Sequence, residues 1–231
     1  MRKSLMVCAI ASVAMGGMIF RCNTENSPTT PPDTVPGNVI LSEGFEGDLS
    51  NYKQITYVEG QGKMSISTQH ALFGKGALTS DSNNTGIKGI FSPYIEDSIA
   101  GLQFYLMATK VAHTNFFAAI CKPGSSNTGV VTKFGMGIDK SDSLNCIYDD
   151  YLNDIKEYKN FAPLSLNKWY KCKIEYNYND TTLTYYLDNA VVHTIPVSNP
   201  TTLQIFIAMR DSLGAQGQSG YYLDNVSIYK R

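Results

Sequence analysis

Gly220-Tyr221-Tyr222-Leu223-Asp224-Asn225-Val226-Ser227-Ile228-Tyr229 lies at the end of the chain and has the aromatic and aliphatic residues of a β-strand, with one carboxylate near its midpoint. Near the other end, Ser42-Glu43-Gly44-Phe45-Glu46-Gly47-Asp48 opens the region that carries apolar patterning. From Val39 onward, short strand-like runs alternate with turn signals, and none of them has the period of a helix. The pattern predicts an all-β sandwich.

Composition supports this fold class and limits the function. The chain has 231 residues, of which 43% are hydrophobic and 17% charged, with 15 Tyr and 19 Gly. Many tyrosines and few charges suit half-buried sheets joined by turns. The net charge of −1 gives no electrostatic reason to expect a nucleic acid or an acidic membrane surface as partner.

Residues 1–22 have the features of an export signal: Arg2 and Lys3 precede an apolar run that is short for a membrane span. The leader is either cleaved at a small-x-small site or lipidated at Cys22, where the sequence resembles a bacterial lipoprotein tether. Arg21 departs from that motif, which has a small residue there. Residues 23–38 form a Pro/Thr-rich linker, and residues 39–231 form one domain. We therefore expect a secreted or cell-envelope protein.

The clearest supersecondary unit runs from Trp169 to Val197. Tyr170, Cys172 and Ile174 alternate with charged residues, which predicts a core-facing strand side and a buried thiol at Cys172. Asn and Asp residues mark two tight turns, at 179–181 and 188–190, because they tolerate left-handed backbone. The unit is predicted to form three consecutive antiparallel strands.

Several motifs, taken in order, resemble those of concanavalin A-like and laminin-G-like jelly-roll domains. They are the Phe45-Glu46 opening, the segment Ala71-Leu72-Phe73-Gly74-Lys75-Gly76-Ala77-Leu78, the hairpin that begins at Asn167-Lys168-Trp169, and the closing Asp224-Asn225-Val226. The family includes calcium-stapled carbohydrate-binding modules of bacterial extracellular proteins. The resemblance implies an antiparallel jelly-roll β-sandwich of two sheets, with little or no helix and with its first and last strands paired.

The resemblance also implies a structural calcium ion held by Glu46 and Asp224, with help from the main chain near Gly74 and Lys75. Two carboxylates on neighbouring strands repel each other unless a cation lies between them, and calcium prefers oxygen ligands. The alternative is that Asp224 caps a bulge and Glu46 is a solvated edge residue.

A sugar-binding surface is the second candidate site. The densest mixture of aromatic and planar polar side chains includes Tyr148, Asp149 and Tyr151, close to Asp139, Asn145 and Asp154. Arg210 precedes a Gly/Gln/Ser-rich loop. Saccharide rings stack on aromatic faces, and their hydroxyl groups need polar partners. The alternative is that these tyrosines are ordinary amphipathic strand residues, and a register shift of one residue would turn Tyr148 inward.

Catalysis has weaker support. Retaining sandwich glycosidases of this fold carry a Glu-x-Asp-x-x-Glu run on one strand, and no such run occurs here. The sequence favours a non-catalytic carbohydrate-binding or surface adhesion module, a monomer whose partner is a polysaccharide or glycan. The alternatives are a polysaccharide lyase or glycoside hydrolase of the jelly-roll class, and a structural envelope protein. A disulfide between Cys121 and Cys146 is a further open question.

Overall fold

The computed structural model describes residues 38–56, 63–80, 86–93, 95, 99–110, 115–123, 130–139, 141–150, 155–197, 204–211 and 220–230. The predicted leader, the linker and Tyr151 lie outside these residues. Within the described ranges, no helix is long and apolar enough to cross a membrane.

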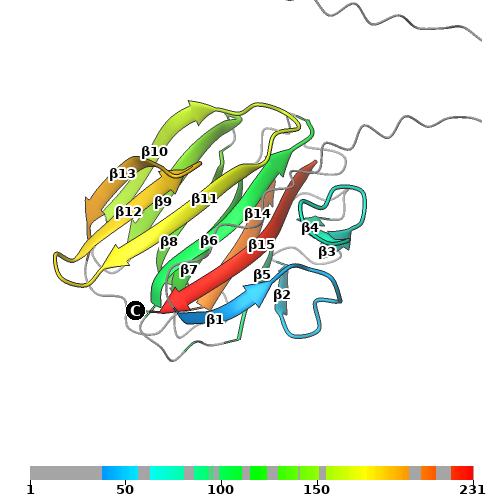
Figure 1. Ribbon diagram of the computed structural model, residues 1–231, viewed down its shortest axis with the longest axis horizontal. Helices are drawn as coiled ribbons and strands as arrows, with labels where there is room; N and C mark the ends of the chain where they lie inside the picture. Colours follow the sequence, from blue (N-terminus) through cyan, green and yellow to red (C-terminus); the bar gives the residue numbers. More distant parts are fainter. Residues whose placement is uncertain are drawn as a thin grey trace, which may run out of the picture.

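Fifteen antiparallel strands form two stacked sheets (Figure 1). The eight-stranded sheet has the order β13-β12-β11-β6-β15-β4-β3, and β1 also pairs with β15. Its strands are β1 (Asn38–Glu43), β3 (Met64–Ser67), β4 (Ala77–Ser80), β6 (Ile99–Ala108), β11 (Tyr170–Asn177), β12 (Thr182–Leu187), β13 (Ala190–Pro196) and β15 (Tyr221–Lys230).

The seven-stranded sheet has the order β10-β9-β8-β7-β14-β5-β2. Its strands are β2 (Lys53–Thr56), β5 (Gly86–Phe91), β7 (Asn115–Pro123), β8 (Val130–Ile138), β9 (Ser143–Asp150), β10 (Ile155–Pro163) and β14 (Gln204–Asp211). The prediction of an all-β jelly-roll sandwich with two sheets is confirmed, and the first strand pairs with the last along Asn38↔Lys230 to Glu43↔Val226.

The main core lies between the sheets and follows the period-two alternation of the strands. On β11, Tyr170, Cys172 and Ile174 are buried, as the sequence predicts. Burial also raises the pKa of the Cys172 thiol. Tyr185 crosses the core, and its hydroxyl donates a hydrogen bond to the carbonyl of Ile147 at 3.1 Å. This contact links the two sheets.

The described cysteines form no disulfide. Cys121 on β7 belongs to a cluster on the outer face of the seven-stranded sheet, whereas Cys146 on β9 faces the main core. Strand β8 runs between them. A bond between these two thiols is therefore ruled out by position, since disulfide sulfurs must come from Cβ atoms about 4 Å apart.

Two glycines let the seven-stranded sheet curve at β8. A Cβ atom at Gly135 would lie 2.9 Å from the Cβ of Ala119, and one at Gly137 would lie 2.6 Å from the Cβ of Phe117. Facing Cβ atoms in a flat antiparallel pair are about 4.5–5.5 Å apart. The Cβ directions of β7 and β8 therefore converge on the outer face, which makes that face concave between these strands.

Candidate functional site

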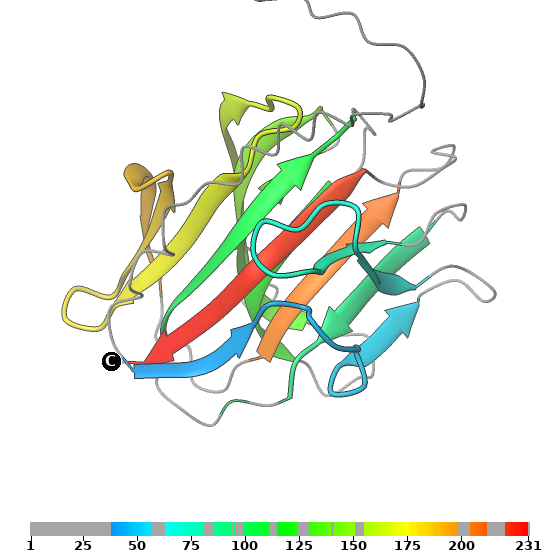
Figure 2. The ribbon, with the colours of Figure 1, turned by 45° about the vertical axis from the view of Figure 1, so that its right-hand side comes forward.

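The closing strand carries a buried carboxylate that holds a loop. Asp224 is 0% exposed, and its Oδ2 accepts hydrogen bonds from the backbone N–H groups of Leu72 (2.8 Å) and Phe73 (3.0 Å). Its Oδ1 accepts the N–H of Asn225 at 2.6 Å. The pairing of β15 with β6 shifts register between Asp224 and Ser227, so Asp224 also stands at a bulge. Figure 2 shows the segment between β3 and β4 crossing over β15.

Glu46 holds the next residues of the same loop. Its Oε1 and Oε2 accept the N–H of Lys75 at 2.9 and 2.8 Å, and Oε1 also accepts the N–H of Gly76 at 3.4 Å. Gly74 has φ +67°, and a Cβ there would overlap the Glu46 carboxylate. Glycine is thus required at position 74 for both backbone and space. We call the set Glu46, Asp224 and residues 72–76 the clasp.

The clasp brings together the two residues predicted to bind calcium. Burial raises the pKa of Asp224 despite the three N–H groups that it accepts, and the charge of Glu46 adds to the rise. Among the described residues, no group of three or more His, Cys, Asp or Glu side chains is arranged to hold a metal. The loop offers N–H donors to both carboxylates, so a cation would have to share their oxygens with these donors. Calcium at the clasp stays a prediction.

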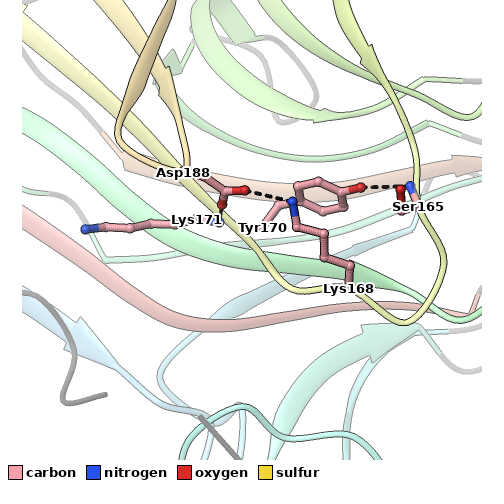
Figure 3. Close-up of polar contacts among 5 residues, drawn as sticks. All are labelled: Ser165, Lys168, Tyr170, Lys171 and Asp188. Atoms are coloured by element: carbon pink, nitrogen blue, oxygen red, sulfur yellow. Dashed lines mark hydrogen bonds and ion pairs between the residues drawn. The ribbon is translucent and has the colours of Figure 1, made fainter. Parts of the chain in front are cut away.

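A second polar cluster ties the β12–β13 turn to the segment before β11 (Figure 3). Asp188 Oδ1 accepts the N–H of Lys171 at 2.9 Å, and its Oδ2 pairs with Lys168 Nζ at 2.9 Å. The same ammonium lies 4.4 Å from the ring centroid of Tyr170, whose hydroxyl accepts the N–H of Ser165 at 2.8 Å. Every contact holds one part of this chain to another, which indicates a structural role.

The concave outer face of the seven-stranded sheet has an apolar middle. Side chains from β5, β7 and β9 form a cluster in which no member is more than 8% exposed; they are Phe91, Phe117, Ala119, Cys121 and Ile147. Gly135 and Gly137 lie in the same face on β8, between β7 and β9. This cluster is therefore built from small, aliphatic and aromatic residues, and its side chains are packed rather than open to solvent.

One end of this face is polar. Asn145 on β9 is paired in register with Gly137 on one side and with Asn160 on the other. Asn160 is exposed, and its Nδ2 donates to Asp139 Oδ2 at 2.9 Å. Asn145 is 4% exposed, and its Oδ1 has no hydrogen-bond partner in the described structure. We call Asp139, Asn145 and Asn160 the polar row.

Asp139 is held as a carboxylate by its neighbours. Burial by itself would raise its pKa, but hydrogen bonds from Ser141, Ser143 and Asn160 outweigh it and lower the pKa below the usual value. The N–H groups of Ser141 and Ser143 lie 2.9 and 3.0 Å from Oδ1. The polar row therefore presents a carboxylate and an amide oxygen, both hydrogen-bond acceptors, at one end of the concave face.

The predicted sugar-binding residues do not meet at one point. Asp149 on β9 is in register with Lys133, then Cys121, then Gln204, and Arg210 lies six residues beyond Gln204 on β14. That offset corresponds to roughly 20 Å along the strands, in addition to the two strands between β9 and β14. Any ligand that touches both positions must be extended.

Tyr148 and Asp149 are expected on opposite sides of β9. Leu144 and Cys146 face the main core, and Asn145 and Ile147 lie on the concave side. Period-two alternation therefore predicts that Tyr148 falls on the core side and Asp149 on the concave side. By the same argument Arg210 is predicted on the concave side, since Ile207 faces the core. Tyr151 lies outside the described residues.

Sequence reasoning missed Asn160 and the role of the two glycines. The signal for the glycines was present, because Phe134-Gly135-Met136-Gly137-Ile138 alternates large and minimal side chains with the strand period. Asn160 gives no comparable signal, since a single Asn near Asp139 is common in loops and only the pairing of β9 with β10 brings it beside Asn145.

No protein-family model matches the sequence, and no curated protein matches it. Similar solved structures include an endo-β-galactosidase from Clostridium perfringens that releases GlcNAcα1-4Gal (TM-score 0.62, 11% identity), where the match covers 87% of this chain and 64% of that chain. A Bacteroides ovatus GH16 protein of a mixed-linkage glucan locus, in complex with a product, matches with TM-score 0.61 and 12% identity over 81% of this chain and 99% of that chain.

The carbohydrate recognition domain of Emp46p also matches, with TM-score 0.55 and 10% identity over 78% of this chain and 88% of that chain. At these identities the similarity establishes the architecture alone. The neighbours include enzymes that act on glycans and a domain that recognises them. The chain therefore has the concanavalin-like jelly-roll fold, as the motifs at its two ends predict.

Proposed function

We propose that this protein is a non-catalytic carbohydrate-binding or surface adhesion module, and that it binds polysaccharide on the concave face of the seven-stranded sheet. The observation that carries the proposal is the composition of that face, in which a polar row adjoins a buried apolar cluster. Saccharides need both kinds of surface, because their rings have apolar faces and their edges carry hydroxyl groups.

Asp149 and Asp139 do not form the close carboxyl pair of a glycosidase. Asp149 is in register with Lys133, and Asp139 lies six residues further along the same strand direction. These two carboxylate positions are thus separated by roughly 20 Å. Glycosidases need a carboxyl pair about 5–10 Å apart across the scissile bond. A jelly-roll hydrolase remains the second candidate, since several structural neighbours are glycoside hydrolases.

A panel of purified polysaccharides tests the proposal. The folded domain should be retained by at least one of them in affinity electrophoresis, and the same mixture should release no reducing or unsaturated ends. Release of such ends would establish the enzyme alternative. Failure to bind and to cleave any member would favour a structural envelope role.

We also propose that the clasp takes up calcium. The support is the convergence of Glu46 and Asp224 on residues 72–76 and the repulsion between two nearby carboxylates. A ligand that binds only the folded state adds about 2.7 kcal/mol at a hundredfold excess over its Kd. Calcium should therefore raise the Tm of the wild type and leave that of Asp224→Ala unchanged. Equal melting curves with calcium and with chelator would exclude the site.

Export and tethering complete the proposal. The leader and Cys22 would place the domain on the outside of the cell, and the Pro/Thr-rich linker would act as an extended spacer. Expression of the full chain in a bacterial host with radiolabelled palmitate tests the tether. The wild type should take up label and Cys22→Ser should not; equal labelling of both would show that Cys22 is not the lipidated residue.

A further inference from the structure

The strongest unexplained feature of the concave face is Asn145. Its side chain is 4% exposed, and its Oδ1 is buried without a hydrogen-bond partner among the described residues. Buried polar groups are nearly always paired, because leaving one unpaired is unfavourable by about 1–3 kcal/mol. An amide at this position, in place of a leucine, therefore lowers the stability of the free protein.

The neighbours of Asn145 define what could pair with it. Gly137 faces it on β8 and has no side chain, and Asn160 faces it on β10 with its Nδ2 already donated to Asp139. The missing partner must be a hydrogen-bond donor, since an amide oxygen only accepts. Asn160, the neighbour of Asn145 on the edge strand β10, is exposed, so solvent reaches the polar row at Asn160.

The charge beside Asn145 limits the ligand further. Asp139 accepts hydrogen bonds from four donor groups of Ser141, Ser143 and Asn160, which favour its ionised form. A sugar carboxylate or sulfate brought to this row would meet an anion and an amide oxygen, both of which repel it. A neutral sugar would bring hydroxyl groups, which donate to both.

We propose that Asn145 Oδ1 accepts a hydrogen bond from a hydroxyl group of a neutral sugar residue, and that the polar row selects neutral glycans over uronate-bearing or sulfated ones. This inference rests on the proposed function of the concave face and names its ligand class. It also separates the protein from the lyase alternative, whose substrates carry uronates.

The test compares two matched buried amides. Gln103 on β6 is 2% exposed, and its Nε2 likewise has no partner in the described structure, but it lies in the other sheet. Asn145→Leu and Gln103→Leu both replace an unpaired buried amide by an apolar side chain of similar size. Calorimetric titration with neutral gluco- and galacto-oligosaccharides and with oligogalacturonides, together with Tm in the absence of sugar, is measured for the wild type and both variants.

We expect the wild type to bind a neutral oligosaccharide and no oligogalacturonide. Asn145→Leu should bind about tenfold more weakly, the loss of one buried hydrogen bond. Its Tm without sugar should equal or exceed that of the wild type, because the Oδ1 that is removed has no partner in the described structure. Gln103→Leu should bind like the wild type. If Asn145→Leu does not fold, Asn145→Ala is used for the same comparison.

The other outcomes overturn the inference in distinguishable ways. Binding of Asn145→Leu within twofold of the wild type would show that Oδ1 receives no sugar hydroxyl. A fall of several degrees in its Tm, with Gln103→Leu unaffected, would show that Oδ1 already has a partner, such as a buried water. Wild-type binding to oligogalacturonides alone would refute neutral selectivity while the binding function stands. No binding to any oligosaccharide would refute both.

Discussion

The outer faces of the two sheets each carry a buried polar side chain, and the two differ in whether that side chain is fully hydrogen-bonded. On the eight-stranded sheet, Asp224 is fully buried and accepts three backbone N–H groups, and residues 72–76 lie over the sheet above it. On the seven-stranded sheet, Asn145 is almost as deeply buried and its Oδ1 is unpaired in the described structure. The chain therefore pairs the carboxylate of Asp224, whereas among the described residues it leaves Asn145 Oδ1 unpaired.

Aromatic contacts show the same difference. On the outer face of the eight-stranded sheet, the ring centroids of Phe73 and Tyr105 lie 5.5 Å apart, edge to face, and those of His70 and Tyr222 lie 4.7 Å apart. Trp169 packs on the small cluster that contains Tyr222. These rings are occupied by contacts within the chain. The comparison indicates that aromatic content alone does not mark a sugar-binding face here, since His70 and Phe73 use ring contacts to hold the β3–β4 loop to its sheet.

Asp224→Ala should have the largest effect, because it removes the acceptor of three partly buried N–H groups, those of Leu72, Phe73 and Asn225. We expect a loss of roughly 3 kcal/mol in the free energy of unfolding, measured by urea denaturation. The control is Asp188→Ala, which removes a half-exposed carboxylate with one backbone N–H and one Lys168 partner. It should lose about 1 kcal/mol. Equal losses in the two variants would show that the clasp contributes nothing special.

Gly137→Ala tests the curvature of the outer face of the seven-stranded sheet. An added Cβ would come 2.6 Å from the Cβ of Phe117, and backbone atoms of β7 leave no room for it to move. Overpacking of this kind destabilises by about 1–3 kcal/mol. Gly47→Ala is the control, since nothing lies within 4 Å of a Cβ at that position. A Gly137→Ala domain as stable as the wild type would refute the concave geometry between β7 and β8.

Asp149→Ala and Arg210→Ala should weaken glycan binding by about 1 kcal/mol each, without lowering the Tm much. The structure adds a condition, because their register positions are roughly 20 Å apart along the strands. Both effects should appear with a long oligosaccharide, and at most one with a disaccharide. Tyr148→Ala, by contrast, should lower stability, since alternation predicts that this position faces the core. Loss of binding with unchanged stability in Tyr148→Ala would reverse that assignment.

The pH dependence of stability should show the smallest effect, with opposite signs at two carboxylates. Burial raises the pKa of Asp224 in the folded state, so its contribution is fully present below about pH 4 and is lost as pH rises through the folded pKa. Hydrogen bonds lower the pKa of Asp139 against its burial, so its contribution is present above about pH 4 and is lost as pH falls. As pH rises from 3 to 7, the urea midpoint of the wild type should fall relative to that of Asp224→Asn and rise relative to that of Asp139→Asn. Bound calcium would reverse the sign at Asp224, and the same sign in both variants without calcium would contradict the assignment.

The fold could be predicted because its signals are local. The alternation of Tyr170, Cys172 and Ile174 fixes one strand face, and Asp188 and Asn189 adopt the positive φ angles that their turn requires. The convergence of Glu46 and Asp224 on the Gly74 loop also follows from the motifs at the ends of the chain. The motifs do not indicate that the loop presents backbone N–H groups, rather than carbonyl groups, to the two carboxylates.

The polar row could be predicted only in part: the sequence groups Asp139 and Asn145 with the tyrosines, but strand pairing is what adds Asn160. Asn145 and Asn160 are fifteen residues apart, and only the β9–β10 register makes them neighbours. The sequence instead emphasised the dense Tyr148-Asp149 stretch, whose alternate residues belong to different faces of one strand. Local density of suitable residue types is therefore a poor guide in a sheet, where a site is assembled across strands.

The most direct test of the central claim is a map of amide chemical shifts during titration with a neutral oligosaccharide that the domain binds. The account predicts that the perturbed amides cluster on β8, β9 and β10, around Gly137, Asn145 and Asn160, while those of residues 72–76 and Trp169 stay unchanged. Perturbations confined to the β3–β4 loop and Trp169 would place the ligand on the outer face of the eight-stranded sheet and contradict the account.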